Sequence, residues 1–188
     1  AALLLLVSRY GGGGHRVVAE TLPEREEIGT AAAAGGGNVR IPAFAGGRSQ
    51  ESMFRLGEMY QDGKLNQHRV YLDSPMAIAA TEVYQRHRDM FNREDRRALG
   101  RGGGPSAFLP GLRFTRTAEE SMALNRIAGG AIIIAGSGMC NGGRIRHHLK
   151  HNLWRKSAHV VIVGFQAAGT PGRALVDGAR TFPLGGER

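Results

Sequence analysis

A short apolar run followed by a small or glycine-rich turn and then a helical pattern recurs along this chain. The runs are 39–44, Arg69–Asp73, Ala131–Ala135 and 159–165, with residues 1–7 as a fifth candidate. Strands that alternate with helices form a mainly parallel sheet with helices packed on its faces. The sequence therefore predicts an α/β fold, and its 188 residues suit a single domain over residues 1–188.

Helix start and stop signals occupy the segments between these runs. Ser74 and Pro75 form an N-cap and first-turn pair, Thr117 and Glu120 match a capping box, and Asp62 precedes a helix-ending glycine. A further helix is predicted from about 144 to 154. Inward-facing positions are predicted by helical spacing at Met53, Leu56, Tyr60, Met76, Ala80, Val83, Tyr84, Met122, Leu124 and Ile127. Glycine-rich composition predicts loops at 11–14, 31–37 and 100–105.

Charge favours a polyanionic partner. Twenty-five Lys and Arg against 16 Asp and Glu give a formal net charge of +9, and nucleic acid is the expected partner of such a chain. Charge alone leaves open a basic protein without such a partner. The single cysteine, Cys140, excludes an internal disulfide and favours a reducing cytoplasm. The apolar run 1–7 is too short to span a bilayer, so no membrane association is expected.

The segment 131–144 carries the strongest indication of a binding site. Its apolar strand leads to Gly136 and Gly138, and Gly142 and Gly143 then open a helix whose free N–H groups can hold an anion. Ser137, Met139 and Arg144 belong to the same candidate turn. The alternative is that the glycines only permit close strand–helix packing.

Other strand ends have similar turns. In an open parallel sheet the carboxyl ends of the strands share one edge, where ligand sites collect. Arg48 and Arg173 taken singly are more typical of plain surface charge, but together these turns predict a basic rim for a sugar-phosphate backbone. The candidate RNA- or phosphate-binding residues are Arg48, Ser74, Ser137, Gly138, Met139, Gly142, Gly143, Arg144, Gly169, Thr170 and Arg173.

Four motifs in this order resemble the β-CASP family of RNA-processing nucleases: IPAFAGGRSQ at 41–50, YLDSPMA at 71–77, GMCNGGR at 138–144 and GFQAAGT at 164–170. The resemblance implies a Rossmann-like domain that accompanies a metallo-β-lactamase domain of the same parent protein, with RNA passing between the two toward a pair of zinc ions. It also implies that the zinc ligands lie outside this chain. We therefore expect no catalytic residue, metal ligand or cofactor within it. Val7 stands where the family usually has an acid that orients a catalytic histidine.

Several residues suggest other chemistry. His147 and His151 have the spacing of a helical metal pair but lack a nearby acid, so a solvated basic face is the better interpretation. Cys140 is not expected to be a nucleophile, and Asp73 is interpreted as orienting its turn. The stretch 86–101 is interpreted as an ion-paired helix face, with an RNA grip as the alternative.

The resulting hypothesis is an RNA-clamping, substrate-guiding part of a zinc-dependent ribonuclease, inactive alone. A stand-alone RNA-binding module and a mononucleotide-binding α/β domain are the alternatives. Endonuclease or exonuclease activity, RNA sequence preference and a homodimer stay open.

Overall fold

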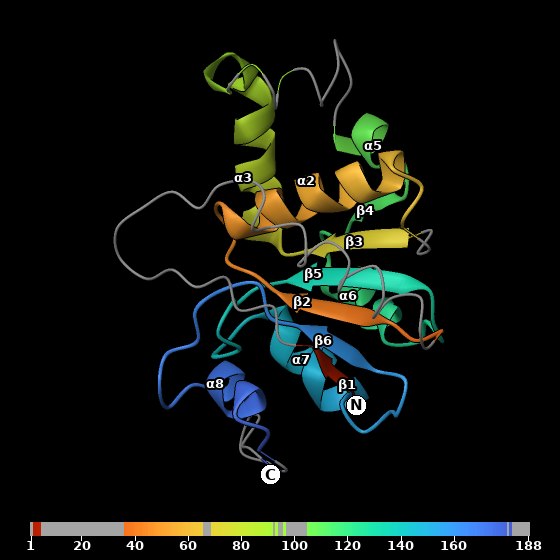
Figure 1. The fold of residues 1–188 in the computed structure, drawn as a ribbon, viewed down its shortest axis with the longest axis vertical. Coiled ribbons are helices and arrows are strands. Elements are labelled where there is room, and N and C mark those ends of the chain that lie inside the picture. Colours follow the sequence, from red (N-terminus) through yellow and green to blue (C-terminus); the bar gives the residue numbers. More distant parts are fainter. Residues whose placement is uncertain are drawn as a thin grey trace.

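The computed structural model describes residues 2–4, 36–65, 69–91, 93, 96, 105–179 and 181. Within them lies one parallel sheet of six strands in the order β1-β6-β2-β5-β3-β4. Figure 1 shows this order from β4 near the top to β1 near the bottom. The strands are β1 (Ala2–Leu4), β2 (Val39–Pro42), β3 (Arg69–Asp73), β4 (Leu112–Phe114), β5 (Ala131–Ala135) and β6 (His159–Val161). The predicted α/β fold is confirmed.

The predicted strands differ from the observed ones mainly at their ends. β3 and β5 have the predicted bounds, whereas β2 and β6 end at Pro42 and Val161, before the predicted runs do. The sequence analysis missed β4, because three residues without a following glycine turn do not stand out as a strand. The predicted loop 100–105 is wrong at Pro105, which opens α5 (Pro105–Phe108). Residues 5–35, including Val7 and the predicted loop 11–14, lie outside the described residues.

The helix caps follow the sequence prediction. The Ser74 hydroxyl accepts a hydrogen bond from the Ala77 amide at 3.3 Å, and Thr117 and Glu120 form the capping box. Asp62 is the C-cap of the first long helix. The helices besides α5 are α2 (Arg48–Gln61), α3 (Pro75–Arg86), α6 (Ala118–Leu124), α7 (Arg144–Asn152) and α8 (Pro171–Val176), with a 3₁₀ turn η2 (Arg88–Met90).

Some predicted inward faces are wrong. Met76 is 73% exposed, and Met122, Tyr60, Val83 and Tyr84 are exposed as well. The face of α3 that packs inward carries smaller side chains, among them Ala77, Ile78 and Thr81. The sequence analysis assigned the bulky apolar residues of α3 to the core, whereas the buried positions of this helix are 77, 78 and 81.

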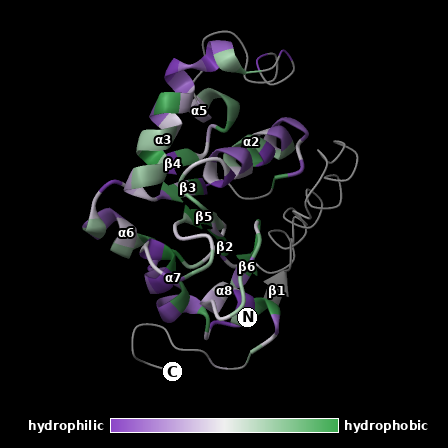
Figure 2. Ribbon diagram, turned by 90° about the vertical axis from the view of Figure 1, so that its left-hand side faces the viewer, coloured by the Kyte–Doolittle hydropathy of each residue, from purple (hydrophilic) through white to green (hydrophobic). Residues whose placement is uncertain are grey.

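Two apolar clusters lie on opposite faces of the sheet. Alternate residues of β5 face opposite ways, so Ile132 and Ile134 join one cluster, while Ala135 joins the other with Ile145 and Leu149 of α7. Figure 2 shows α2 to one side of the strands and α6 and α7 to the other. Because both faces are covered, β5 is buried at all five positions, as predicted for a central parallel strand.

Candidate nucleic-acid interface

The loops that follow β2, β3, β5 and β6 meet at the carboxyl edge of the sheet. The Ala43 amide donates to the Ala135 carbonyl at 3.0 Å, which joins the first loop to the end of β5, where the third loop begins. Gln166 Nε2 donates to the Gly138 carbonyl at 2.9 Å, which joins the fourth loop to the third. We call residues 43–47, 73–75, 136–143 and 162–170 the loop rim. The predicted gathering of these turns at one edge is therefore found.

The turn 136–143 is shaped by its own hydrogen bonds. The Ser137 amide donates to the Gly142 carbonyl at 3.0 Å, and the Ser137 hydroxyl accepts from the Gly142 amide at 3.2 Å. Gly143, with φ 71° and ψ −175°, is the N-cap of α7 and provides no side-chain cap. The Ile145 amide donates to the Gly136 carbonyl at 2.9 Å and the Arg146 amide to the Gly143 carbonyl at 3.3 Å, so two amides in the first turn of α7 are already paired within the protein. Ser137 stabilises the turn through its two hydrogen bonds with Gly142, a role that the sequence analysis did not anticipate.

Asp73, at the end of β3, is the centre of a buried polar network. Its Oδ1 accepts hydrogen bonds from Thr115 Oγ1 at 2.5 Å and Arg144 Nη1 at 2.7 Å. Its Oδ2 accepts from Ser121 Oγ at 2.6 Å and lies 2.6 Å from His148 Nε2. The side chain is fully buried. One carboxylate therefore ties β3 to α7, to α6 and to the segment between β4 and α6; we call these five side chains the Asp73 hub.

The hub keeps Asp73 ionised. Burial by itself would raise the pKa of Asp73, but hydrogen bonds from His148, Ser121 and Thr115 and the attraction to His148 outweigh it and lower the pKa to about 2. Charge-assisted hydrogen bonds of this kind are stronger than neutral ones. The hub is thus built around a negative charge, and protonation of that charge works against the folded state.

This pKa predicts an acid-dependent loss of stability. A carboxyl whose pKa is lower in the folded than in the unfolded chain stabilises the fold above its unfolded pKa, and the contribution disappears as the pH falls toward the folded pKa. We expect Asp73 to contribute about 2 kcal/mol that is lost between roughly pH 4 and pH 2. Urea unfolding at several pH values would measure it, as the difference between the wild-type chain and Asp73→Asn. A difference that does not change over this range would contradict the assignment.

The Arg144 guanidinium is fixed by hydrogen bonds within the protein. Besides pairing with Asp73, it donates to the Thr115 carbonyl at 3.0 Å and to the Arg116 carbonyl at 2.9 Å. The phosphate-binding role predicted for Arg144 stays a prediction, and the structure adds an internal role to it. Its side chain is 20% exposed and stands at the start of α7, beside the loop rim.

The other predicted binding residues have local partners as well. Arg48 pairs with Glu51 at 2.6 Å, and Arg173 pairs with Asp177 at 2.9 Å. Such pairs at the surface contribute little, so a phosphate can replace the carboxylate. Ser74 caps α3, and Thr170 caps α8 next to Gly169, whose φ is 80°.

The sequence analysis missed two exposed aromatic residues on the loop rim. Phe44 is 45% exposed and Phe165 is 59% exposed. Each follows a strand, and each was counted as part of an apolar run that in fact ends earlier. Phe44 also packs against the turn, because a Cβ added to Gly138 would lie 2.8 Å from its ring. An aromatic residue placed after the last pairing residue of a strand is a signal that could have been used.

Three expectations concern residues that suggested other chemistry. Burial raises the pKa of Cys140 to about 12, so this thiol is not a nucleophile. His147 and His151 are exposed on α7, as a solvated basic face requires. Of the stretch 86–101, residues 92, 94, 95 and 97–101 lie outside the described part, and η2 at Arg88–Met90 replaces the start of the predicted helix face.

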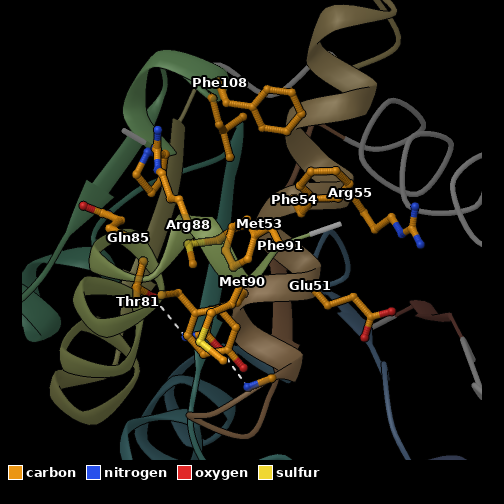
Figure 3. Close-up of a pocket in the computed structure, with 15 residues that line it drawn as sticks. Glu51, Met53, Phe54, Arg55, Thr81, Gln85, Arg88, Met90, Phe91 and Phe108 are labelled. Carbon is orange, nitrogen blue, oxygen red and sulfur yellow. Dashed lines mark hydrogen bonds between the residues drawn. The ribbon is translucent and has the colours of Figure 1, made fainter. Parts of the chain in front are cut away.

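A cavity of about 620 Å³ opens between α2, α3, η2 and α5, with Gly47 of the loop rim in its lining. Its walls include the rings of Phe54 and Phe108, which stack at 5.3 Å, together with Met53 and Phe91. Figure 3 shows Arg55 pointing away from this apolar centre. The cavity offers apolar walls to a ligand, and it differs in this from the loop rim.

Two further properties bear on the class of protein. No helix in the described part of the chain is long and apolar enough to cross a membrane. In the same part, no group of three or more His, Cys, Asp and Glu side chains is arranged to hold a metal ion. The parallel sheet with helices on both faces makes this an α/β domain, a class in which ligand sites collect at the carboxyl ends of the strands.

Comparison with known proteins identifies the family. The Beta-Casp domain model matches residues 49–175, and the chain belongs to this family. It is 40% identical over 178 residues to Ribonuclease TTHA0252 of Thermus thermophilus, covering 94% of this chain and 40% of that protein. It is 32% identical over 152 residues to Transcription termination factor FttA of Methanosarcina mazei, covering 81% of this chain and 24% of that protein. It is 32% identical over 145 residues to an RNase J-like protein of Methanocaldococcus jannaschii, covering 77% of this chain and 32% of that protein. The chain thus spans well under half the length of these relatives.

Proposed function

We propose that this chain is the RNA-clamping and substrate-guiding part of a zinc-dependent RNA phosphodiesterase. The observation that carries the proposal is the loop rim, where four loops meet beside the start of α7 and expose Phe44 and Phe165. Two relatives with ribonuclease names support the choice of RNA as substrate. The formal charge of +9 is favourable for a polyanion.

Different residues of the rim contact different parts of the RNA. Exposed aromatic rings stack on unpaired bases, and this contact tolerates any base sequence. Arg48 and Arg173 exchange their surface carboxylates for phosphate oxygens. The Asp73 hub ties the loop after β3 to α7, so little conformational entropy is lost there when RNA binds.

Cleavage of the RNA phosphodiester in this family of reactions calls for zinc, and the described residues are not suited to bind it. Zinc would supply a hydroxide for attack on the phosphodiester, but zinc prefers clusters of His, Cys and acidic side chains, and the described residues offer no such cluster. We therefore place the zinc ions and the attacking water in a metallo-β-lactamase domain of the parent protein. A buried single cysteine suits a reducing compartment, and we place the parent in the cytoplasm.

The proposal predicts binding without cleavage. The chain should bind single-stranded RNA with an affinity that falls steeply with salt, by a log–log slope of about 0.7 per phosphate contact, and a chelator should not change it. Phe44→Ala and Phe165→Ala should each weaken binding by about 1–3 kcal/mol. Fluorescence anisotropy of a labelled oligonucleotide measures both effects.

Tyr60→Ala is the matched control, since Tyr60 is as exposed as Phe44, at 45%, but lies near the far end of α2. It should leave the affinity unchanged. Saturation by a mononucleotide with a shallow salt dependence would favour the mononucleotide-binding alternative. Chelator-sensitive cleavage by the chain alone would contradict the placement of the zinc ions.

A further inference from the structure

A long part of the chain is basic without any acidic residue. From 121 to 176 the sequence contains no Asp or Glu, and its Lys and Arg residues are Arg126, Arg144, Arg146, Lys150, Arg155, Lys156 and Arg173. The net charge of the protein is therefore concentrated there. α7 and the turn after it lie within this segment.

α7 has one buried side and one basic side. Ile145, His148, Leu149 and Asn152 are buried against the sheet and the hub. The opposite side carries polar and basic residues, in agreement with the largely hydrophilic colouring of α7 in Figure 2. We call this side with its continuation the α7 strip: His147, Lys150, His151, Trp154, Arg155 and Lys156. The charged side chains of the strip are all basic.

Trp154 stands at the end of this strip with a fixed orientation. The residue is 74% exposed, yet its indole Nε1 donates a hydrogen bond to the His151 carbonyl at 2.9 Å. The Arg155 guanidinium lies 5.3 Å from the centre of its ring. A single exposed apolar residue is unremarkable at a protein surface. A tryptophan held in place among cations is different, because it offers a preorganised flat surface to another ring.

We propose that the α7 strip is a second contact surface for single-stranded RNA, in which a base stacks on Trp154 and the cations neutralise the neighbouring phosphates. The proposal rests on the RNA-binding function given above and extends it. α7 starts beside the loop rim at Arg144, and the helical rise puts Trp154 roughly 15 Å further along. A strand held at the rim thus reaches Trp154 by following the helix. Because the strip is positively charged, it suits a polyanion. The aromatic ring favours unpaired bases over a duplex.

The chain has one tryptophan, so intrinsic fluorescence reports on this surface alone. A single-stranded oligoadenylate is titrated into the 188-residue chain, and indole fluorescence is followed together with the anisotropy of labelled RNA. Stacking should quench the fluorescence with the same midpoint as the anisotropy change. Trp154→Ala should weaken binding about tenfold, whereas Trp154→Phe should retain most of the affinity. Lys156→Gln should lower the log–log salt slope by about 0.7.

Tyr60→Ala again serves as the control for an exposed aromatic residue elsewhere. RNA binding that is weakened by Phe44→Ala, but without quenching and unaffected by Trp154→Ala, would overturn the α7 strip and leave the rim function standing. Quenching together with weaker binding by Trp154→Ala, and no effect of Phe44→Ala, would support the α7 strip and contradict the rim function. No RNA binding by the chain at low salt would overturn both proposals.

Discussion

Asp73→Asn is expected to lower the free energy of unfolding by about 3–5 kcal/mol, the range for removing one partner from a buried ion pair. Asn has the same size as Asp, so packing is retained. The loss comes from the Arg144 guanidinium, which pairs with Asp73 Oδ1 at 2.7 Å, from the Thr115 hydroxyl on the same oxygen, and from the Ser121 hydroxyl and the His148 imidazole at Oδ2. An amide can accept at only one atom, and its NH₂ group would face donors at the other.

Urea unfolding at neutral pH, followed by circular dichroism, measures the change. Asp177→Asn is the matched control, because Asp177 also pairs with an arginine, Arg173, but does so at the surface. It should leave the unfolding midpoint nearly unchanged. If both variants unfold at the same urea concentration, the hub does not have the stabilising role assigned to it.

Gly143→Ala is expected to destabilise the protein by about 2–4 kcal/mol. Gly143 has φ 71° and ψ −175°, a region of backbone conformation essentially restricted to glycine. A Cβ at this position would also collide with the carbonyl oxygen of Gly136, to which the Ile145 amide donates at 2.9 Å. The backbone of the turn would have to move, and the start of α7 with it.

The neighbouring glycine provides the control. A Cβ added to Gly142 would meet nothing within 4 Å, so Gly142→Ala should change stability by less than about 1 kcal/mol. Thermal unfolding of the two variants distinguishes them, since the substitutions differ only in position. Equal melting temperatures would show that the turn tolerates a side chain at residue 143. RNA affinity of Gly143→Ala, measured where the variant is folded, then reports on the turn itself.

The sequence predicted those parts of the fold that depend on neighbouring residues. The Ser74 cap, the Thr117 capping box and the strand Arg69–Asp73 each follow from a few adjacent positions. The gathering of loops at one edge was also predictable, because it follows from parallel strands whatever their order.

The Asp73 hub could not be predicted in the same way. Thr115, Ser121, Arg144 and His148 lie between 42 and 75 positions from Asp73. No periodic pattern connects residues so far apart, and sequence alone left Asp73 as a residue that orients a turn. His148 is one position from His147, but it faces the core because helical geometry turns adjacent residues to different sides.

The sheet order has a consequence for synthesis of the chain. Among the strands that the structure describes, β1 pairs with β6 alone, with Ala2 opposite His159. At translation rates of about 5–20 residues per second, the first strand leaves the ribosome roughly ten seconds or more before its partner does. Until then this edge of the sheet stays incomplete, and chaperones that shield apolar segments have time to act on the nascent protein.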